Sequence, residues 1–336
     1  MNLLPDADQR EIIATAASLL AKEFPLGRGT GENASGSVDA SWRRLGGLGW
    51  FALAVPSAEG GAGYSLVEEA LLFRELGRAL LPGPVLATVL AAKAAVAGGA
   101  SDWFEQLASG ERTAGLAEPY RDPGAEVGRV VRGRFRLVDA TGAGVLLVTD
   151  RSSVALIEAT EVADREVFEP IDASSTVEVA TIDSARSLSV VLPDQIPLAA
   201  QGSVLLAAAL VGICEATRDQ SVAYASQRVQ FDKPIGSFQA VKHRCADMSV
   251  RAEAAGALTF YAALALRDGF GDAGRLVKLA KALAGDYAQA SAADNIQNHG
   301  GMGFTEDCSA HRYLRRTLLW NTMLGSPAEL QSTVLT

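Results

Sequence analysis

Three long stretches with helical periodicity dominate the C-terminal part of the chain. Apolar residues recur at helical spacing over residues 201–226, 238–267 and 273–298. The connections between these stretches are short, so consecutive helices must fold back on one another. The sequence therefore predicts an antiparallel four-helix bundle over residues 199–336.

The first third of the chain reads as shorter helices separated by turns. Asp6 or Asp8 and Ser65 are candidate N-caps. The predicted helices cover residues 6–24, 42–50, 65–76 and 85–98. A glycine cluster at residues 60–63 could bind phosphate, but no complete GxGxxG follows a strand there, so a turn before the cap of the next helix is favoured.

A β-rich segment separates the two helical parts. Its Val-rich runs alternate in part and are punctuated by Gly, Pro and Asp, which is typical of strands. The predicted strands are residues 129–138, 145–149, 154–158, 176–182 and 187–192. We therefore expect an α+β, mainly α protein with an N-terminal helical domain (1–114), a small middle β domain (115–198) and a C-terminal helical bundle (199–336).

The charge and the cysteine content of the chain restrict its classes of partner and its cellular compartment. The net charge of -9 argues against nucleic acid or an anionic membrane as the main partner. Cys214, Cys245 and Cys308 are scattered and suit a reducing cytoplasm as inert thiols. The N-terminus lacks the basic start of a signal peptide, and the longest apolar run, residues 204–214, is too short to span a bilayer. These features predict a cytoplasmic protein.

Two segments have the composition of a binding site. Residues 228–243, RVQFDKPIGSFQAVKH, place a guanidinium, aromatic rings and an amide at the corner between two helices. Such a corner can anchor a diphosphate and its base. Residues 297–305, QNHGGMGFT, form a glycine-rich helix end that lets a ligand approach the backbone. The alternative is that Arg228 only caps a helix and the glycines only form a turn.

Both segments closely resemble signatures of the acyl-CoA dehydrogenase family. Residues 46–50, 60–63 and 75–78 also resemble its N-terminal helical domain. The resemblance implies FAD at a subunit interface, with Arg228 on the diphosphate and Phe231 packed on the cofactor. The remaining implied FAD contacts are Phe238 and Gln239 near the adenosine, and Gln297, Gly300 and Gly301 at the other end.

The residues expected to carry the family's chemistry are missing. In the family a Glu removes the α-proton of the thioester while flavin N5 accepts the β-hydride. The two positions at which family members carry this Glu fall on Leu324 and Gly202, and the neighbouring substrate-binding Arg falls near Ser203. In the second signature, Arg315 is followed by Arg316, where an acidic residue is usual.

The contacts to the flavin ring also differ from the family pattern. A Thr-Glu-Pro segment lies against the ring in the family, whereas this chain has Ala117-Glu118-Pro119 and lacks the hydroxyl. The β domain looks shortened, and the usual Trp-containing strand that faces the flavin is not evident. A chain with these departures is expected to make poor contact with a flavin ring of its own.

The chain therefore resembles the non-catalytic subunit of heteromeric acyl-CoA dehydrogenases, such as those that some actinobacteria use on steroid side-chain CoA thioesters. The resemblance implies an α2β2 assembly with one FAD per heterodimer. A homologous catalytic subunit would supply the base, the flavin-ring contacts and most of the acyl-CoA pocket. An electron-transfer flavoprotein would accept the electrons.

Three alternatives remain open. The first is a homomeric dehydrogenase with a relocated base, for which Glu215, Asp219 and Glu329 are the candidates. The second is a scaffold subunit that binds a partner and no flavin, and the third is a relative that oxidises something other than a thioester. The isolated histidines, His243, His299 and His311, are expected to have no metal-binding or relay role.

Overall fold

The computed structural model describes residues 5–26, 40–194 and 197–335. Its contacts divide the chain into two compact units, each assembled from segments that are distant in sequence. The first unit contains residues 1–28, 67–81 and 203–336, and the second contains residues 29–66 and 82–202. The predicted division of the chain into three consecutive domains, with boundaries at residues 114 and 198, remains a proposal.

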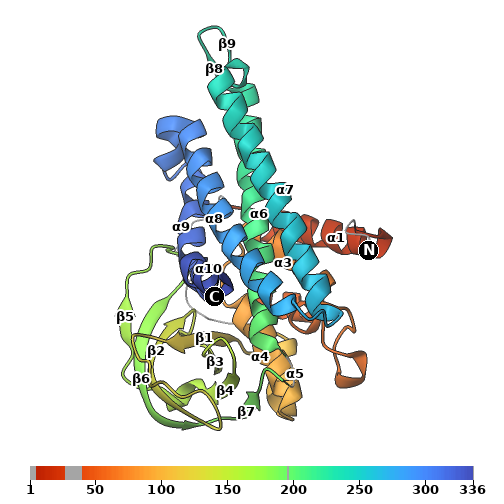
Figure 1. Cartoon of the computed structure of the whole chain (residues 1–336), viewed down its shortest axis with the longest axis vertical. Helices are drawn as coiled ribbons and strands as arrows, with labels where there is room; N and C mark the ends of the chain where they lie inside the picture. Colours follow the sequence, from red (N-terminus) through yellow and green to blue (C-terminus); the bar gives the residue numbers. More distant parts are fainter. Residues whose placement is uncertain (1–4, 27–39, 195–196, 336) are drawn as a thin grey trace. The chain divides into compact units, whose positions relative to one another are not determined.

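The first unit is helical. Its long helices α6, α7 and α8 run side by side (Figure 1), as their apolar periodicity predicts. The helices that lie wholly or mostly in this unit are α1 (Ala7–Glu23), α3 (Leu66–Ala79), α6 (Leu198–Gln227), α7 (Gln239–Arg267), α8 (Ala273–His299), α9 (Ala310–Trp320) and α10 (Pro327–Leu335). Short elements connect them: β8 (Val229–Gln230), β9 (Lys233–Pro234), and the 3₁₀ turns η4 (Ile235–Ser237) and η5 (Gly300–Phe304).

Helices α3 and α6 approach each other at backbone distance. A Cβ atom added at Gly77 would lie 1.9 Å from the carbonyl oxygen of Ala209, and one at Gly212 would lie 2.0 Å from that of Arg74. Only glycine avoids these collisions. The close approach brings the polar side chains of α3 directly against those of α6.

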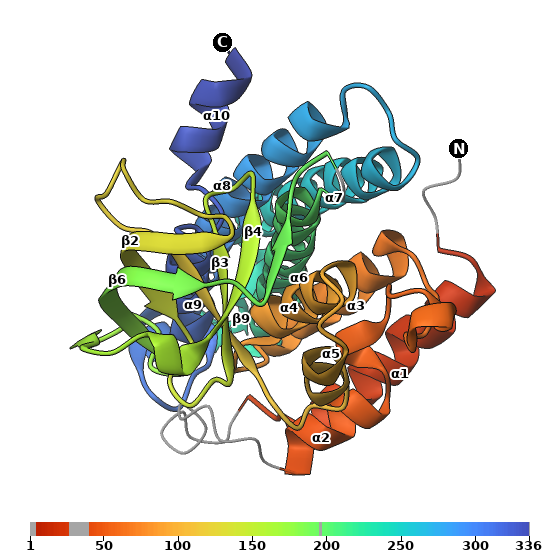
Figure 2. The same cartoon turned by 90° about the horizontal axis from the view of Figure 1, so that it is seen from below.

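The second unit combines helices with a sheet. Its described residues form α2 (Ala40–Gly47), η1 (Trp50–Ala52), η2 (Ser57–Glu59), α4 (Val85–Ala97), α5 (Ser101–Ala108) and η3 (Ala159–Glu161). They also form a seven-stranded sheet in the order β5 (Glu166–Phe168), β6 (Val177–Arg186), β2 (Val130–Val138), β1 (Ala114–Pro119), β3 (Val145–Thr149), β4 (Val154–Glu158) and β7 (Ser189–Val191). Neighbouring strands are antiparallel except β1 and β3. Figure 2 shows β4 crossing the direction of β2 and β6 steeply, because the sheet twists.

The five predicted strands are present, but β1 and β5 were not predicted. Strand β1 has the sequence AGLAEP, and Ala, Gly, Glu and Pro are all depleted in strands. It forms because β2 and β3 pair with its two edges, and its first five residues are buried. Strand β5 has only three residues, all exposed, at the edge of the sheet. Both strands depend on tertiary pairing rather than on local propensity.

Helix α6 is the one helix in the described part of the chain that is long and apolar enough to cross a membrane. The apolar run of residues 204–214, which is too short to predict a membrane span, is only the central part of this helix. In the structure, 78% of its most apolar window is buried within the protein. A helix that is apolar all round and buried in this way has the character of a core helix.

Candidate functional site

The corner after α6 is a tight hairpin. Strands β8 and β9 pair through Val229 and Pro234, and the two residues at the turn, Phe231 and Asp232, have φ values of 54° and 62°. Two consecutive positive φ values correspond to a type I′ turn, which is uncommon for a bulky aromatic residue. The turn leaves 86% of Phe231 exposed. The chain therefore holds an aromatic ring in solvent at a backbone cost, which is frequent at functional sites.

Arg228 lies at the base of this hairpin with its side chain exposed. Its backbone N–H donates to the carbonyl of Tyr224, and its own carbonyl accepts from Ile235, both at 2.8 Å. Within the described residues, its guanidinium has no ion-pair or hydrogen-bond partner. The guanidinium is therefore available to an anionic ligand or partner.

The other predicted residues of the corner lie around the ring of Phe238. Phe231 contacts this ring edge-on, with centroids 6.1 Å apart, and Nζ of Lys233 lies 4.5 Å from its centroid. Gln239 is exposed at the start of α7, and its Nε2 lies 3.3 Å from Nε2 of His243. The corner thus presents aromatic, amide and cationic groups together.

The second predicted segment ends α8. Gly300 has φ 60° and ψ -141°, a conformation that only glycine adopts readily. A Cβ atom at Gly300 or Gly301 would meet nothing within 4 Å, and Gln297 is exposed. The backbone at this helix end is open to a ligand.

The structure brings the two segments together. The ring of Tyr224, one turn before Arg228, stacks on the ring of His299 with centroids 4.3 Å apart. One turn earlier, Oγ of Ser221 donates to Oδ1 of Asn295 over 2.8 Å. The corner and the glycine-rich end therefore lie at the same end of the bundle, near β8 and β9 in Figure 1. An available guanidinium, an exposed aromatic ring and open glycine backbone fit a dinucleotide with a diphosphate, such as FAD.

The two positions expected to hold a catalytic base carry apolar residues in the structure as well. Leu324 lies between α9 and α10, is 2% exposed and has φ 52°. Beside it, Nζ of the buried Lys281 donates to the carbonyl of Gly325 over 3.3 Å. Gly202 is buried near the start of α6. Neither position offers a proton acceptor.

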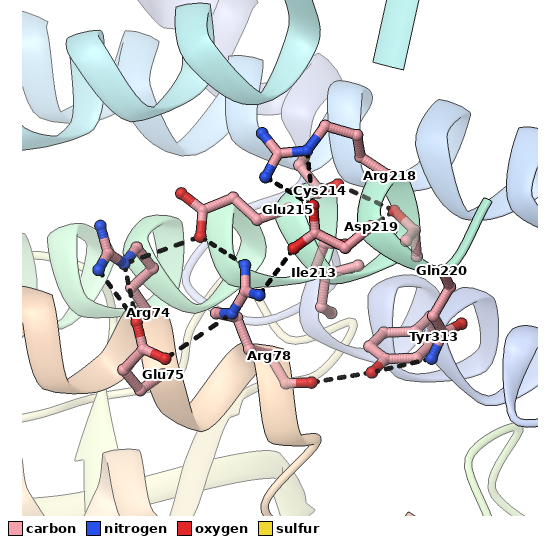
Figure 3. Close-up of polar contacts among 11 residues, drawn as sticks. Arg74, Glu75, Arg78, Ile213, Cys214, Glu215, Arg218, Asp219, Gln220 and Tyr313 are labelled. Atoms are coloured by element: carbon pink, nitrogen blue, oxygen red, sulfur yellow. Dashed lines mark hydrogen bonds and ion pairs between the residues drawn. The ribbon is translucent and has the colours of Figure 1, made fainter. Parts of the chain in front are cut away.

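Glu215 and Asp219 lie in an ion-pair cluster between α3 and α6 (Figure 3). Arg78 donates to Glu215 over 2.9 Å and to Asp219 over 2.7 Å, and Arg74 lies 3.8 Å from Glu215. Although burial opposes ionisation, hydrogen bonds from Arg78 and Arg218 outweigh it and lower the pKa of Asp219. A carboxylate with a lowered pKa is a poor proton acceptor. The cluster gives both groups a structural role.

The α3 side of this cluster was not predicted from the sequence. Glu75 is buried, and Arg74 donates to it over 3.0 Å. Burial raises the pKa of the Glu75 carboxyl, against the lowering influence of Arg74 and Arg78. The ion pairs of Arg74 and Arg78 with α6 depend on the close approach of α3 and α6, which has no signal in the local pattern.

The remaining candidate groups also have structural explanations. Glu329 accepts from the backbone N–H and the hydroxyl of Ser326, both at 2.9 Å, and so closes the start of α10. His311 is buried, and burial followed by the charge of Arg315 lowers its pKa. Burial raises the pKa of Cys214 to about 12, which makes it an unreactive thiol. Within the residues that the structure describes, no group of three or more His, Cys, Asp or Glu side chains could hold a metal ion.

Glu118, which matches the family pattern, and Arg316, which departs from it, both have defined partners. Glu118 in β1 is 6% exposed and pairs with the opposite residue of β2, Arg136, over 2.9 Å. Arg316 is buried, donates to the carbonyl of Leu81 over 2.9 Å and lies over the ring of Trp320. An acidic residue at position 316 could not make either contact.

The second unit has a separate hollow of about 950 Å³. Glycines 46, 47, 49, 60 and 61 line it together with Phe104. Its charged lining groups are Glu59 and Glu105, and no cationic side chain is among them. Because phosphate binding favours cationic donors, the glycine cluster is better explained as a turn than as a phosphate site.

Comparisons with known proteins agree with this geometry. The family model for the acyl-CoA dehydrogenase N-terminal domain matches residues 6–111, and that for the C-terminal domain matches residues 199–334. The acyl-CoA dehydrogenase IpdE2 of Mycolicibacterium smegmatis is 30% identical over 96% of both chains. Acyl-CoA dehydrogenase FadE34 of Mycobacterium tuberculosis is 38% identical over 84% of this chain, which spans only 40% of FadE34.

Solved structures share the fold. A glutaryl-CoA dehydrogenase with glutaryl-CoA superimposes with a TM-score of 0.86 at 22% identity, covering 100% of this chain and 96% of the other. The ChsE4-ChsE5 complex from Mycobacterium tuberculosis gives 0.85 at 22% identity, with 99% and 98% coverage. A Tcur3481-Tcur3483 steroid ACAD variant gives 0.81 at 24% identity, with 97% and 96% coverage. At these identities, the three structures establish the fold of the chain.

Proposed function

The chain belongs to the acyl-CoA dehydrogenase family, and we propose that it is the non-catalytic subunit of a heteromeric, FAD-dependent member. In this proposal an α2β2 assembly dehydrogenates a CoA thioester between its α and β carbons. The partner is a homologous catalytic subunit, and this chain completes the partner's FAD site.

One observation carries the proposal: an open cofactor segment coexists with two positions that lack a base. Arg228 has an available guanidinium, whereas Leu324 and Gly202 offer no proton acceptor. A subunit with these properties can hold a flavin for another active site but cannot abstract the α-proton itself. The partner is therefore expected to supply the carboxylate.

Each residue of the cofactor segment has a proposed role. Arg228 pairs with the diphosphate through a bidentate hydrogen bond that Lys cannot form. Phe231 packs on the cofactor, and its exposure suits a residue that becomes covered on assembly. Phe238 and Gln239 surround the adenosine, and Gln297, Gly300 and Gly301 bind the other end. FAD, when bound, accepts the hydride that leaves the β-carbon.

The substrate and partners are proposed from similarity. The fold matches the steroid ACAD of Tcur3481-Tcur3483 and the two-protein ChsE4-ChsE5 complex. These similarities support a steroid side-chain CoA substrate and a heteromeric assembly. An electron-transfer flavoprotein is the proposed electron acceptor. The acidic composition and the unreactive Cys214 suit a cytoplasmic setting.

The test is the flavin content and acyl-CoA oxidation of the chain purified alone and co-expressed with a homologous dehydrogenase subunit. We expect flavin and turnover only in the complex, at one FAD per heterodimer. Turnover by the lone chain would favour the homomeric alternative, and one FAD per chain would contradict the proposed assembly.

Arg228→Ala separates this proposal from a flavin-free scaffold. Loss of the charged contact is expected to weaken FAD binding by about 1.5 to 3 kcal/mol, or roughly 10- to 150-fold. Arg275→Ala removes an exposed arginine at the start of α8 and serves as the matched control. A complex that keeps its flavin equally well in both variants would be a scaffold assembly.

A further inference from the structure

Side chains of α6 and α8 form a ladder just below the proposed cofactor site. On α6 it contains Gln220, Ser221 and Tyr224, and on α8 it contains Asn295 and His299. The contacts are Ser221 Oγ to Asn295 Oδ1 at 2.8 Å, Asn295 Nδ2 to Gln220 Oε1 at 3.0 Å, and the stack of Tyr224 on His299. Ser221 and Asn295 are fully buried.

The ladder ends directly at both cofactor segments. Tyr224 precedes Arg228 by one helical turn, and its backbone carbonyl accepts a hydrogen bond from the backbone N–H of Arg228. His299 is the last residue of α8 and immediately precedes Gly300. The stack therefore joins the helical turn before Arg228 to the residue before the open glycine backbone.

His299 is held from both sides. Its Nδ1 lies 2.8 Å from the carbonyl of Asn295 and must carry the proton, because a carbonyl oxygen only accepts. The hydrogen bond fixes the plane of the ring, and the face of that ring packs on Tyr224 with an interplanar angle of 25°. A ring restrained in this way can set the separation between two helix ends.

We propose that Tyr224 and His299 are positioning residues for the flavin diphosphate, and that their stack sets the spacing between Arg228 and Gly300. The inference rests on the proposed function, since it concerns the same cofactor site. Neither ring needs to touch the cofactor. The stack holds the guanidinium and the open backbone at a fixed separation, so that one FAD molecule contacts both.

The test compares Tyr224→Leu with Tyr224→Phe in the flavin-containing complex. Loss of the stack is expected to weaken FAD binding about three- to tenfold, whereas Phe keeps the stack and stays within about twofold of wild type. His299→Leu and His299→Phe form a second pair with the same expected order. Amide hydrogen exchange at residues 300–304 should accelerate in the two Leu variants before FAD is added.

Leu264→Ala is the matched control for a general loss of stability. Leu264 is 8% exposed and lies near the end of α7 opposite the corner, and α7 spans about 43 Å. This variant is expected to lower the unfolding midpoint without changing the FAD dissociation constant.

The outcomes distinguish this inference from the proposed function. If Arg228→Ala weakens FAD binding while Tyr224→Leu and His299→Leu do not, the positioning role is wrong and the cofactor site stands. Equal losses in Tyr224→Leu and Tyr224→Phe would also overturn it, because the stack would not be the cause. If Arg228→Ala has no effect on FAD, the proposed function itself is wrong.

Discussion

The guanidinium of Arg78 on α3 donates to the carboxylate of Glu215 on α6 across 2.9 Å. The same guanidinium donates to Asp219, so one arginine engages both of the α6 carboxylates that were candidates for a relocated base. Because Glu215 and Asp219 lie one helical turn apart on α6, both carboxylates can pair with the same guanidinium. The homomeric alternative therefore has no support from the candidate bases on α6.

Arg78→Met is expected to destabilise the fold by about 2 kcal/mol, because it removes charged hydrogen bonds and leaves the buried Glu75 with fewer partners. The measurement is the free energy of unfolding from urea titration. Arg267→Met is the control, since Arg267 pairs with its exposed neighbour Asp268 and should show no measurable change. Equal stability of the two variants would mean that the cluster does not hold α3 to α6.

Glu75→Gln should stabilise the protein relative to wild type more at pH 7 than at pH 4. Burial raises the pKa of Glu75 above its ordinary value of 4.5, so the folded protein binds this proton more tightly than the unfolded chain. That stabilisation is complete below about pH 4.5 and is lost as pH rises through the folded pKa. Glutamine stays uncharged and avoids the loss.

Asp219→Asn provides the opposite pH trend as a control. The pKa of Asp219 is lowered in the folded state, so its ionised form stabilises the fold above about pH 4 and this contribution disappears in acid. The cost of Asp219→Asn should therefore be largest at neutral pH and shrink toward pH 3. Parallel trends for the two variants would show that the charges of the cluster were misassigned.

Gly212→Ala should destabilise the first unit by about 1 to 3 kcal/mol, because the added methyl group collides with the carbonyl of Arg74. Gly256→Ala on α7 is the matched control. Its Cβ atom would meet Val211 at an ordinary 3.6 Å, so alanine should be neutral or stabilising there. Thermal unfolding of both variants measures the difference, and similar midpoints would contradict the close approach of α3 and α6.

Leu324→Glu should not produce acyl-CoA oxidation by the lone chain. The new carboxylate would be buried, and in the proposed alignment the chain would still lack the family's substrate-binding Arg, expected near Ser203, and the flavin-ring hydroxyl, expected at Ala117. We expect a loss of stability of about 2 kcal/mol or more from the buried polar group. Leu324→Gln separates the effect of shape from that of charge, and robust turnover by Leu324→Glu would refute the proposed loss of catalysis.

The sequence by itself determined the helices of the bundle and the five Val-rich strands, because periodicity and β-propensity are local properties. It also identified the family, since Arg228 and the glycines at 300 and 301 lie in short contiguous motifs. Counting from those motifs places the expected base position at Leu324, and this placement stays a prediction.

Tertiary structure decided the contacts that have no local signal. Strand β1 exists because β2 and β3 pair with both of its edges, although its own residues disfavour a strand. The engagement of Glu215 by Arg78 and the stack of Tyr224 on His299 each join residues far apart in the chain. A residue pattern records which face of a helix is buried, but the partner that covers that face is set only when the helices pack.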